Sequence, residues 1–324
     1  MTFVRTVLGD IEPGALGVTY AHEHLIIDGG RPVLMEPDFD LGDVAAMARE
    51  VGEAAALGLR AAVDAMPCDA GRNALKLADL SQRTGVHVIA ATGLHHDRYY
   101  GPAHWSARID VSGLADLFAL DVSDGIDAND YSGPIVHRTA HRAGVIKIAG
   151  STGGPSTRDR RIFEAAAEAH IRTGVPILTH CEGGTGALEQ LRLLTDLGVA
   201  PGHIVLSHVD KVVDRAYHGE LLGSGAFGEY DQSFRWGDKP NGTLQLLAWT
   251  VEDGLEDRVL LGMDAARRGY YHVNGGSPGL SWLLAGFTDA MAERGLDEAT
   301  RHRLFVDNPS RAFAFATAST EGGP

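Results

Sequence analysis

The sequence predicts an α/β fold, a closed (β/α)8 TIM barrel that forms one domain over residues 1–324. Short apolar runs alternate with longer amphipathic segments along the whole chain, and eight such runs are present. This alternation indicates parallel strands joined by crossover helices. Eight units favour a closed barrel over an open sheet, and no change of composition marks a second domain.

The apolar runs are nearly continuous, which is typical of strands buried on both faces. They predict strands at 18–21, 61–65, 86–91, 145–149, 175–179, 204–207, 225–228 and 259–262. The segments between them predict helices at 40–57, 72–84, 158–173, 185–197, 243–252 and 281–294. Glycine follows several of these helices, as after Thr84 and Thr173, because it accepts the left-handed backbone of a helix end. We interpret 121–142 as an insertion and 229–241 as a long loop.

Composition narrows the possible functions. Hydrophobic residues make up 44% of the chain, which is enough for a large core, and the net charge of −15 disfavours a nucleic-acid partner. Two cysteines, Cys68 and Cys181, cannot form a four-cysteine zinc site and suggest no disulfide framework. No segment has the roughly 20 apolar residues of a membrane span, and the N-terminus lacks a signal-peptide pattern. We therefore expect a cytoplasmic protein that acts on a small molecule, without membrane partners.

Histidines stand at the end of the first predicted strand, and a barrel of this type has its active site at the strand ends. The run GVTYAHEHL ends in His22-Glu23-His24. Residues two apart in a strand point to the same side, so both imidazoles can reach one ion. Taken alone, the pair could equally be two surface histidines.

Lys147 lies inside the apolar run of the fourth strand. Burying an unpaired ammonium costs several kcal/mol or lowers its pKa. A structural lysine would pack its stem and extend its head to solvent. A functional lysine would act at the barrel mouth as a base or as a carbamate.

Three more strand ends carry residues that can bind metals: His180, His208 and Asp264. Each alone could be structural, but the pattern repeats along the chain. Four histidines, one lysine and one aspartate are too many for one tetrahedral ion, so the sequence predicts two divalent ions. Nitrogen and oxygen ligands suit Zn²⁺ and also Mn²⁺, Co²⁺ or Fe²⁺. A carboxylated Lys147 could bridge two ions, whereas an ammonium could not.

The order of these residues resembles the phosphotriesterase family of the amidohydrolase superfamily. Five stretches carry the resemblance, which extends over essentially the whole chain: GVTYAHEHL, VDAMPCDAGRN, ATGLHHDRYY, RAGVIKIAG and DNPSRAFAF. The resemblance implies that His22, His24 and Asp264 hold the more buried ion. It implies that His180 and His208 hold the more exposed ion, and that these barrels form homodimers.

The resemblance also implies a mechanism. Carboxylated Lys147 and a hydroxide would bridge the two ions, and the hydroxide would be the nucleophile, because coordination lowers the pKa of water toward neutrality. Asp264 would take up its proton as a general base. The expected reaction is hydrolysis of a lactone or a carboxylic ester.

After Asp264 the chain reads AARRGYYHVNGGSPGL, similar to a subgroup that hydrolyses phosphorylated sugar lactones. This likeness implies that Arg267 and Tyr270 hold a phosphate, and the preceding loop could add Arg235 or Lys239. The plainer alternative is that the arginines are ordinary surface residues.

His95 and Tyr99 follow the third strand, and we expect both to line the substrate pocket. The alternative is that they serve only in packing.

Several other functions stay open. A phosphotriesterase or an N-acyl amide hydrolase could use the same site, although Glu229, Tyr230 and Asp231 stand where the true triesterases carry a seventh-strand histidine. A metal-dependent deoxyribonuclease usually has glutamate in place of Lys147, and a deaminase usually binds one ion. A non-enzymatic binding protein would be expected to have lost some of the ligands.

Overall fold

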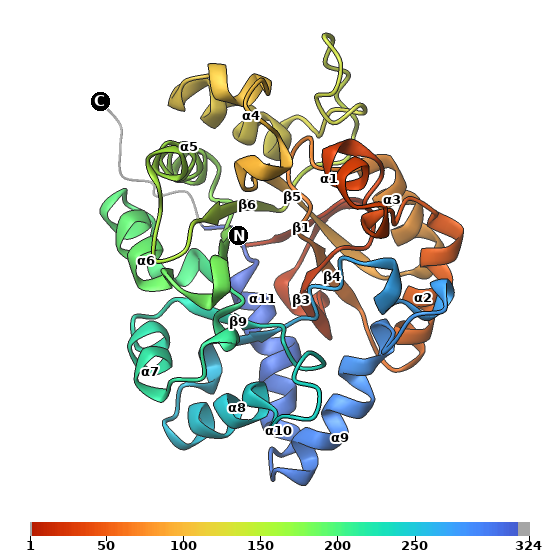
Figure 1. Ribbon diagram of the computed structural model, residues 1–324, viewed down its shortest axis with the longest axis vertical. Helices are drawn as coiled ribbons and strands as arrows, with labels where there is room; N and C mark the ends of the chain where they lie inside the picture. Colours follow the sequence, from red (N-terminus) through yellow and green to blue (C-terminus); the bar gives the residue numbers. More distant parts are fainter. Residues whose placement is uncertain (1, 317–324) are drawn as a thin grey trace.

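The computed structural model describes residues 2–316, in which eight parallel strands are surrounded by helices (Figure 1). The strands pair in chain order: β3 (Thr19–Glu23), β4 (Ala61–Asp64), β5 (His87–Leu94), β6 (Val145–Gly150), β7 (Ile177–Cys181), β8 (Ile204–Ser207), β9 (Phe227–Tyr230) and β10 (Val259–Leu261). Just beyond β10, the Asp264 N–H donates to the His22 carbonyl oxygen at 2.9 Å, which links the last strand to the first. The predicted (β/α)8 barrel is therefore confirmed.

The predicted helices are present with small shifts at their ends, and five further helices within residues 2–316 were not predicted. The helices are α1 (Gly30–Met35), α2 (Val44–Ala56), α3 (Ala74–Thr84), α4 (Val111–Ser123), α5 (Thr157–Thr173), α6 (Ala187–Asp196), α7 (Arg215–Gly223), α8 (Gly242–Glu252), α9 (Gly286–Glu293), α10 (Glu298–His302) and α11 (Asn308–Ala312). The prediction at 281–294 is split between a 3-10 turn, Leu280–Leu284, and α9. No helix within residues 2–316 is long and apolar enough to cross a membrane.

Helix α4 is the longest of the helices that were not predicted, and it overlaps the start of the segment interpreted as an insertion. Its first residues, Val-Ser-Gly, are weak helix formers. Asp110 caps the helix by accepting from the Gly113 N–H, and Leu114 and Phe118 are fully buried. Capping and burial together outweigh the low intrinsic propensity. Helix α7, also missed, is short and contains Gly219.

The seventh strand was predicted two residues too early. It was placed at 225–228, but β9 is Phe227–Tyr230, so Glu229 lies in the strand and not in the following loop. A buried acidic residue interrupted the apolar pattern that marks the other strands. The side chain of Glu229 is fully buried in this strand.

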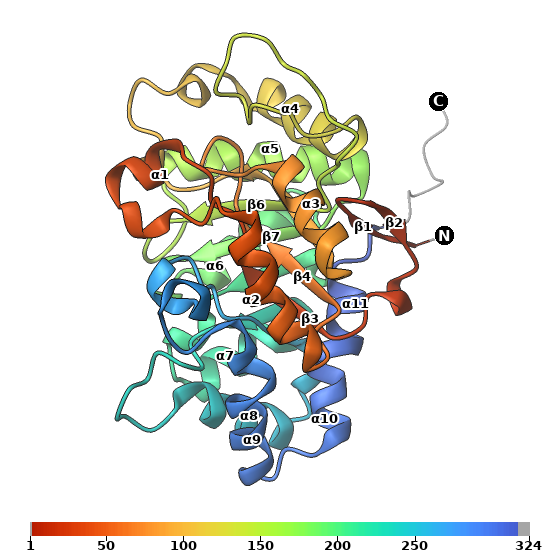
Figure 2. The same cartoon turned by 90° about the vertical axis from the view of Figure 1, so that its right-hand side faces the viewer.

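A hairpin that the sequence did not predict covers one end of the barrel. It consists of β1 (Val4–Thr6) and β2 (Gly9–Ile11), and Figure 2 shows it at the end opposite α1. Val4 from the hairpin and Phe313, just after α11, join the inward-facing apolar side chains of the strands. That inner core includes Ala61, Val63, Ile89, Val145, Leu178, Val205, Phe227 and Leu260. The hairpin end is thus filled, and the other end is left for the site.

Candidate metal centre

The six predicted metal ligands come together at the carboxyl ends of the strands. His22 lies in β3, Lys147 in β6 and His180 in β7, whereas three further residues follow strand ends: His24, His208 and Asp264. Because parallel strands end at the same rim of a barrel, residues far apart in the chain meet there.

Asp264 lies at the centre of a group that it forms with His22, His24 and Lys147. Its Oδ1 atom lies 3.1 Å from His24 Nε2 and 3.7 Å from His22 Nε2. Lys147 Nζ lies 3.3 Å from the same His22 Nε2 atom. These four side chains therefore surround one small volume.

His208 connects this group with His180. The ring centroid of His208 lies 4.8 Å from that of His22 and 4.5 Å from that of His180. Nε2 of His180 also lies 2.9 Å from Glu182 Oε2. The His180 side chain is more exposed than those of His22 and His208.

Two of the residues have an unusual backbone. His208 has φ of 65° and Asp264 has φ of 49°, both in the left-handed region that residues other than glycine rarely adopt. Each stands where the chain leaves its strand. Backbone strain of this kind is concentrated at functional sites.

Lys147 is buried, with 1% of its surface exposed. Gly93 on β5 lies against it with φ of +102°, and a Cβ there would collide with the Lys147 carbonyl oxygen. Burial lowers the pKa of Lys147 to about 8, although Asp264, Glu229 and Asp231 act in the opposite direction. Among residues 2–316 its amine has only His22 as a side-chain hydrogen-bonding partner.

Burial also keeps the histidines neutral. It lowers the pKa of His22, His180 and His208 below the usual value of a histidine. Burial raises the pKa of Asp264, but His208, His24 and His22 outweigh it and hold that pKa well below its ordinary range. The site therefore offers neutral imidazoles beside a carboxylate, the forms that bind metals.

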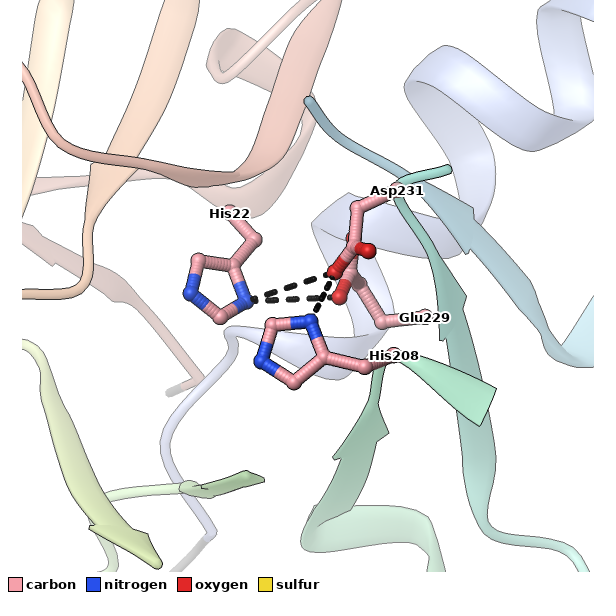
Figure 3. A group of neighbouring side chains, drawn as sticks. All are labelled: His22, His208, Glu229 and Asp231. Atoms are coloured by element: carbon pink, nitrogen blue, oxygen red, sulfur yellow. Dashed lines mark hydrogen bonds and ion pairs between the residues drawn. The ribbon is translucent and has the colours of Figure 1, made fainter. Parts of the chain in front are cut away.

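Two acidic residues that the sequence interpretation placed in a loop stand behind the histidines. Glu229 and Asp231 are fully buried, and Figure 3 shows their carboxylates against His22 and His208. Glu229 Oε2 lies 3.3 Å from His22 Nδ1, and Asp231 accepts a hydrogen bond from His208 Nδ1. Their signal in the sequence was a pair of acids spaced two apart after an apolar run, the same spacing as His22 and His24.

The donor set suits divalent metals. Three groups of side chains around the barrel mouth have ligand atoms within 4.8 Å of one another: His22, His24 and Asp264; His22, His208, Glu229 and Asp231; and His96, His180 and Glu182. Imidazole nitrogen with carboxylate oxygen fits Zn²⁺ and its first-row neighbours. Within residues 2–316 the buried amine of Lys147 has no carboxylate partner, as expected for a lysine that is neutral or carboxylated in such a site.

A cavity of about 270 Å³ opens over this cluster. All five residues predicted to contact the substrate line it: His95, Tyr99, Arg235, Arg267 and Tyr270. Lys239, also considered, lines a neighbouring cavity instead. Cys68 and Cys181 are both buried, and neither lines the cavity.

The two arginines already have protein partners. Arg235 donates to the carbonyl oxygens of Asp231, Met263 and Asp264, so its guanidinium supports the backbone that carries Asp264. Arg267 forms an ion pair with Glu36 at 2.7 Å. A ligand could therefore displace the Glu36 side chain from Arg267 more readily than the three backbone carbonyl oxygens from Arg235.

Three further charged residues that the sequence did not single out line the same cavity: Arg98, Glu182 and Lys211. Glu182 lies beside His180, and Arg98 lies 3.5 Å from the Glu182 carboxylate. Lys211 follows His208 by three residues and is exposed. Sequence spacing alone could not assign them, because the strand-end loops only converge in the folded barrel.

A sequence model of the phosphotriesterase family matches residues 2–313 of the chain. The protein belongs to this family. A phospho-furanose lactonase of Mycoplasmopsis synoviae is 32% identical, and the match covers 97% of this chain and 92% of the relative.

Two solved structures are similar to this chain over most of its length. A lactonase from Listeria monocytogenes superposes with a TM-score of 0.89 at 28% identity, covering 97% of this chain and all of that one (100%). The phosphotriesterase homology protein of Escherichia coli, complexed with phosphate in its active site, has a TM-score of 0.84 at 30% identity, with 92% and 99% covered. This member of the phosphotriesterase family is therefore a hydrolase.

Proposed function

We propose that the protein is a binuclear metal-dependent lactonase whose substrate is a phosphorylated sugar lactone. One observation carries the proposal. The cavity over the ligand cluster has Lys211, Arg235 and Arg267 in its wall, although the chain has a net charge of −15. Guanidinium and ammonium groups bind phosphate through charge-assisted hydrogen bonds. The phosphate in the active site of the Escherichia coli relative and the name of the Mycoplasmopsis relative support this substrate.

The ligands divide into two sets that share carboxylated Lys147. His22, His24 and Asp264 form one set, and His180 and His208 form the other. When bound, the divalent ions lower the pKa of a coordinated water and polarise the substrate carbonyl. The lowered pKa of Lys147 raises the fraction of neutral amine, which is the form that reacts with carbon dioxide.

Asp264 moves the proton in this proposal. Its carboxylate accepts a proton from the attacking water as the new carbon–oxygen bond forms at the lactone carbonyl. It then delivers that proton to the ring oxygen as the acyl carbon–oxygen bond breaks, so the product is the open hydroxy acid. Arg235 holds the carbonyl oxygen of Asp264 and fixes the direction of the carboxylate.

The phosphate would bind at Arg267 and Tyr270, which follow β10, and Lys211 would add a positive charge to the cavity lining. The Arg267 guanidinium would exchange Glu36 for the phosphate, which carries more charge and offers more acceptor oxygens. His95 and Tyr99 would contact the sugar ring from the loop after β5.

The test is a comparison of two five-carbon γ-lactones that differ only in a 5-phosphate, assayed with metal-loaded enzyme. We expect kcat/KM to be about 100-fold higher for the phosphorylated lactone, the effect of one or two charge-assisted hydrogen bonds. Equal values would reject the phosphate subsite and leave a plain lactonase. Cleavage of an N-acyl amino acid or of paraoxon without lactone hydrolysis would reject the lactonase.

A further inference from the structure

Behind the metal centre, on the side away from the cavity, two carboxylates are completely enclosed, one in β9 and one directly after it. Glu229 and Asp231 are 0% exposed, and neither lines the substrate cavity. Glu229 faces His22 Nδ1 at 3.3 Å, whereas Asp231 is hydrogen-bonded to His208 Nδ1 and also lies 4.0 Å from His22 Nδ1. Neither carboxylate can therefore reach a substrate.

The opposite nitrogens of the two rings point the other way. In Figure 3 both Nε2 atoms are directed away from the carboxylates. Nε2 of His22 lies 3.3 Å from Lys147 Nζ and 3.7 Å from Asp264 Oδ1. A neutral imidazole carries one N–H, so a carboxylate at Nδ1 keeps the proton there and leaves the Nε2 lone pair free for an ion.

Glu229 is kept in this place at a cost to stability. Its Oε1 atom has no hydrogen-bonding partner within residues 2–316, and a buried carboxylate without partners is unfavourable. The chain also leaves room for it at Gly262, where a Cβ would lie 2.8 Å from Oε1 and 2.9 Å from the His22 backbone nitrogen. A nearby dication would offset the buried negative charge.

We propose that Glu229 is a positioning residue of the metal centre, which holds His22 with Nε2 toward the ion shared with His24 and Asp264. This inference rests on the proposed metal-dependent function and adds a residue outside the six ligands. Asp231 is hydrogen-bonded to His208 but lies 4.0 Å from His22 Nδ1, beyond hydrogen-bonding distance, so loss of Glu229 removes the hydrogen bond at His22 and weakens one of the two ions selectively. Partners of ligating histidines typically change metal affinity 10- to 100-fold.

The experiment measures bound metal and not turnover. Wild type, Glu229→Gln and Asp127→Asn are loaded with Co²⁺ and dialysed against buffers of graded free Co²⁺. Ions per chain are then counted by mass spectrometry. Asp127 is the control, since it is also almost completely buried but accepts from the backbone N–H groups of Tyr131 and His137 and belongs to none of the groups that could hold a metal.

We expect wild type and Asp127→Asn to hold two ions over the same range of free Co²⁺. Glu229→Gln should release one ion at a roughly 10- to 100-fold higher free concentration and keep the other. If the glutamine variant does not fold, Glu229→Asp keeps the charge but retreats from His22 and should weaken the same ion.

Unchanged affinity for both ions, or equal weakening of both, would overturn the positioning role of Glu229. A wild-type protein that binds no metal would instead overturn the proposed function.

Discussion

The two ends of the barrel are built from the same strands but from opposite kinds of side chain. At the hairpin end, Val145 and Leu178 point inward and pack with Phe313. Two residues further along the same strands stand Lys147 and His180, which face the cavity end. A step of two residues separates an apolar layer from a layer of metal ligands.

This difference follows from the geometry of a strand. Residues two apart share a face and are separated by roughly 7 Å along the strand. The apolar layer at the hairpin end, the lower layer, is closed by the hairpin and α11, so its side chains can only pack against one another. The layer of metal ligands, the upper layer, opens into the cavity, so its polar groups have partners and are accessible from the cavity. Substitutions in the two layers should therefore change different measured quantities.

The largest effect is expected in the upper layer, from Lys147→Ala. The variant loses the group shared by both ligand sets, and kcat/KM should fall by at least about 1000-fold, which corresponds to about 4 kcal/mol in the barrier. Lys76→Ala is the control, since this half-exposed lysine pairs with Asp28 away from the cavity. Steady-state assays of the metal-loaded variants check the prediction, and wild-type activity in Lys147→Ala would contradict it.

The lower layer should respond in stability and not in rate. Phe313→Ala removes a fully buried ring from the closed end and should lower the free energy of unfolding by about 3–5 kcal/mol. Activity per folded molecule should stay close to wild type, as measured by denaturant unfolding beside an assay at low temperature. A large loss of activity in the folded variant would show that the two layers are coupled.

Removal of metal tests whether the closed end supports the fold alone. Chelated protein should stay folded, because the apolar layer is independent of the ligands, but its melting temperature should fall. With each ion present at about 100 times its dissociation constant, each contributes about 3 kcal/mol. Calorimetry with and without chelator measures this difference, and complete unfolding of the chelated protein would contradict the separation of layers.

The smallest effect is expected at the cavity wall, from Arg267→Ala. The loss of one charge-assisted contact should raise KM for a phosphorylated lactone about 10- to 100-fold and leave the unphosphorylated lactone unaffected. The neighbouring Arg268→Ala is the control, because Arg268 is exposed and does not line the cavity. Equal effects on both lactones would place Arg267 outside the phosphate subsite.

Local patterns were sufficient to predict the barrel and the positions of the six candidate ligands. A strand buried on both faces is a continuous apolar run, and a histidine or aspartate at its end is visible in one dimension. The same reasoning failed for Glu229, because an acid inside a strand looks like the start of a loop. It also missed α4, where capping and burial compensate for weak helix formers.

The sequence by itself thus determined the fold class and which residue types stand at the strand ends. Only the tertiary structure decided what the side chains contact. Glu229 lies against His22, Arg235 donates to three backbone carbonyl oxygens, and Arg267 forms an ion pair with Glu36. Periodicity records the environment of a residue along its own strand or helix. Contacts between side chains from different strands and loops, such as Glu229 and His22, exist only once the barrel closes, so no local pattern can encode them.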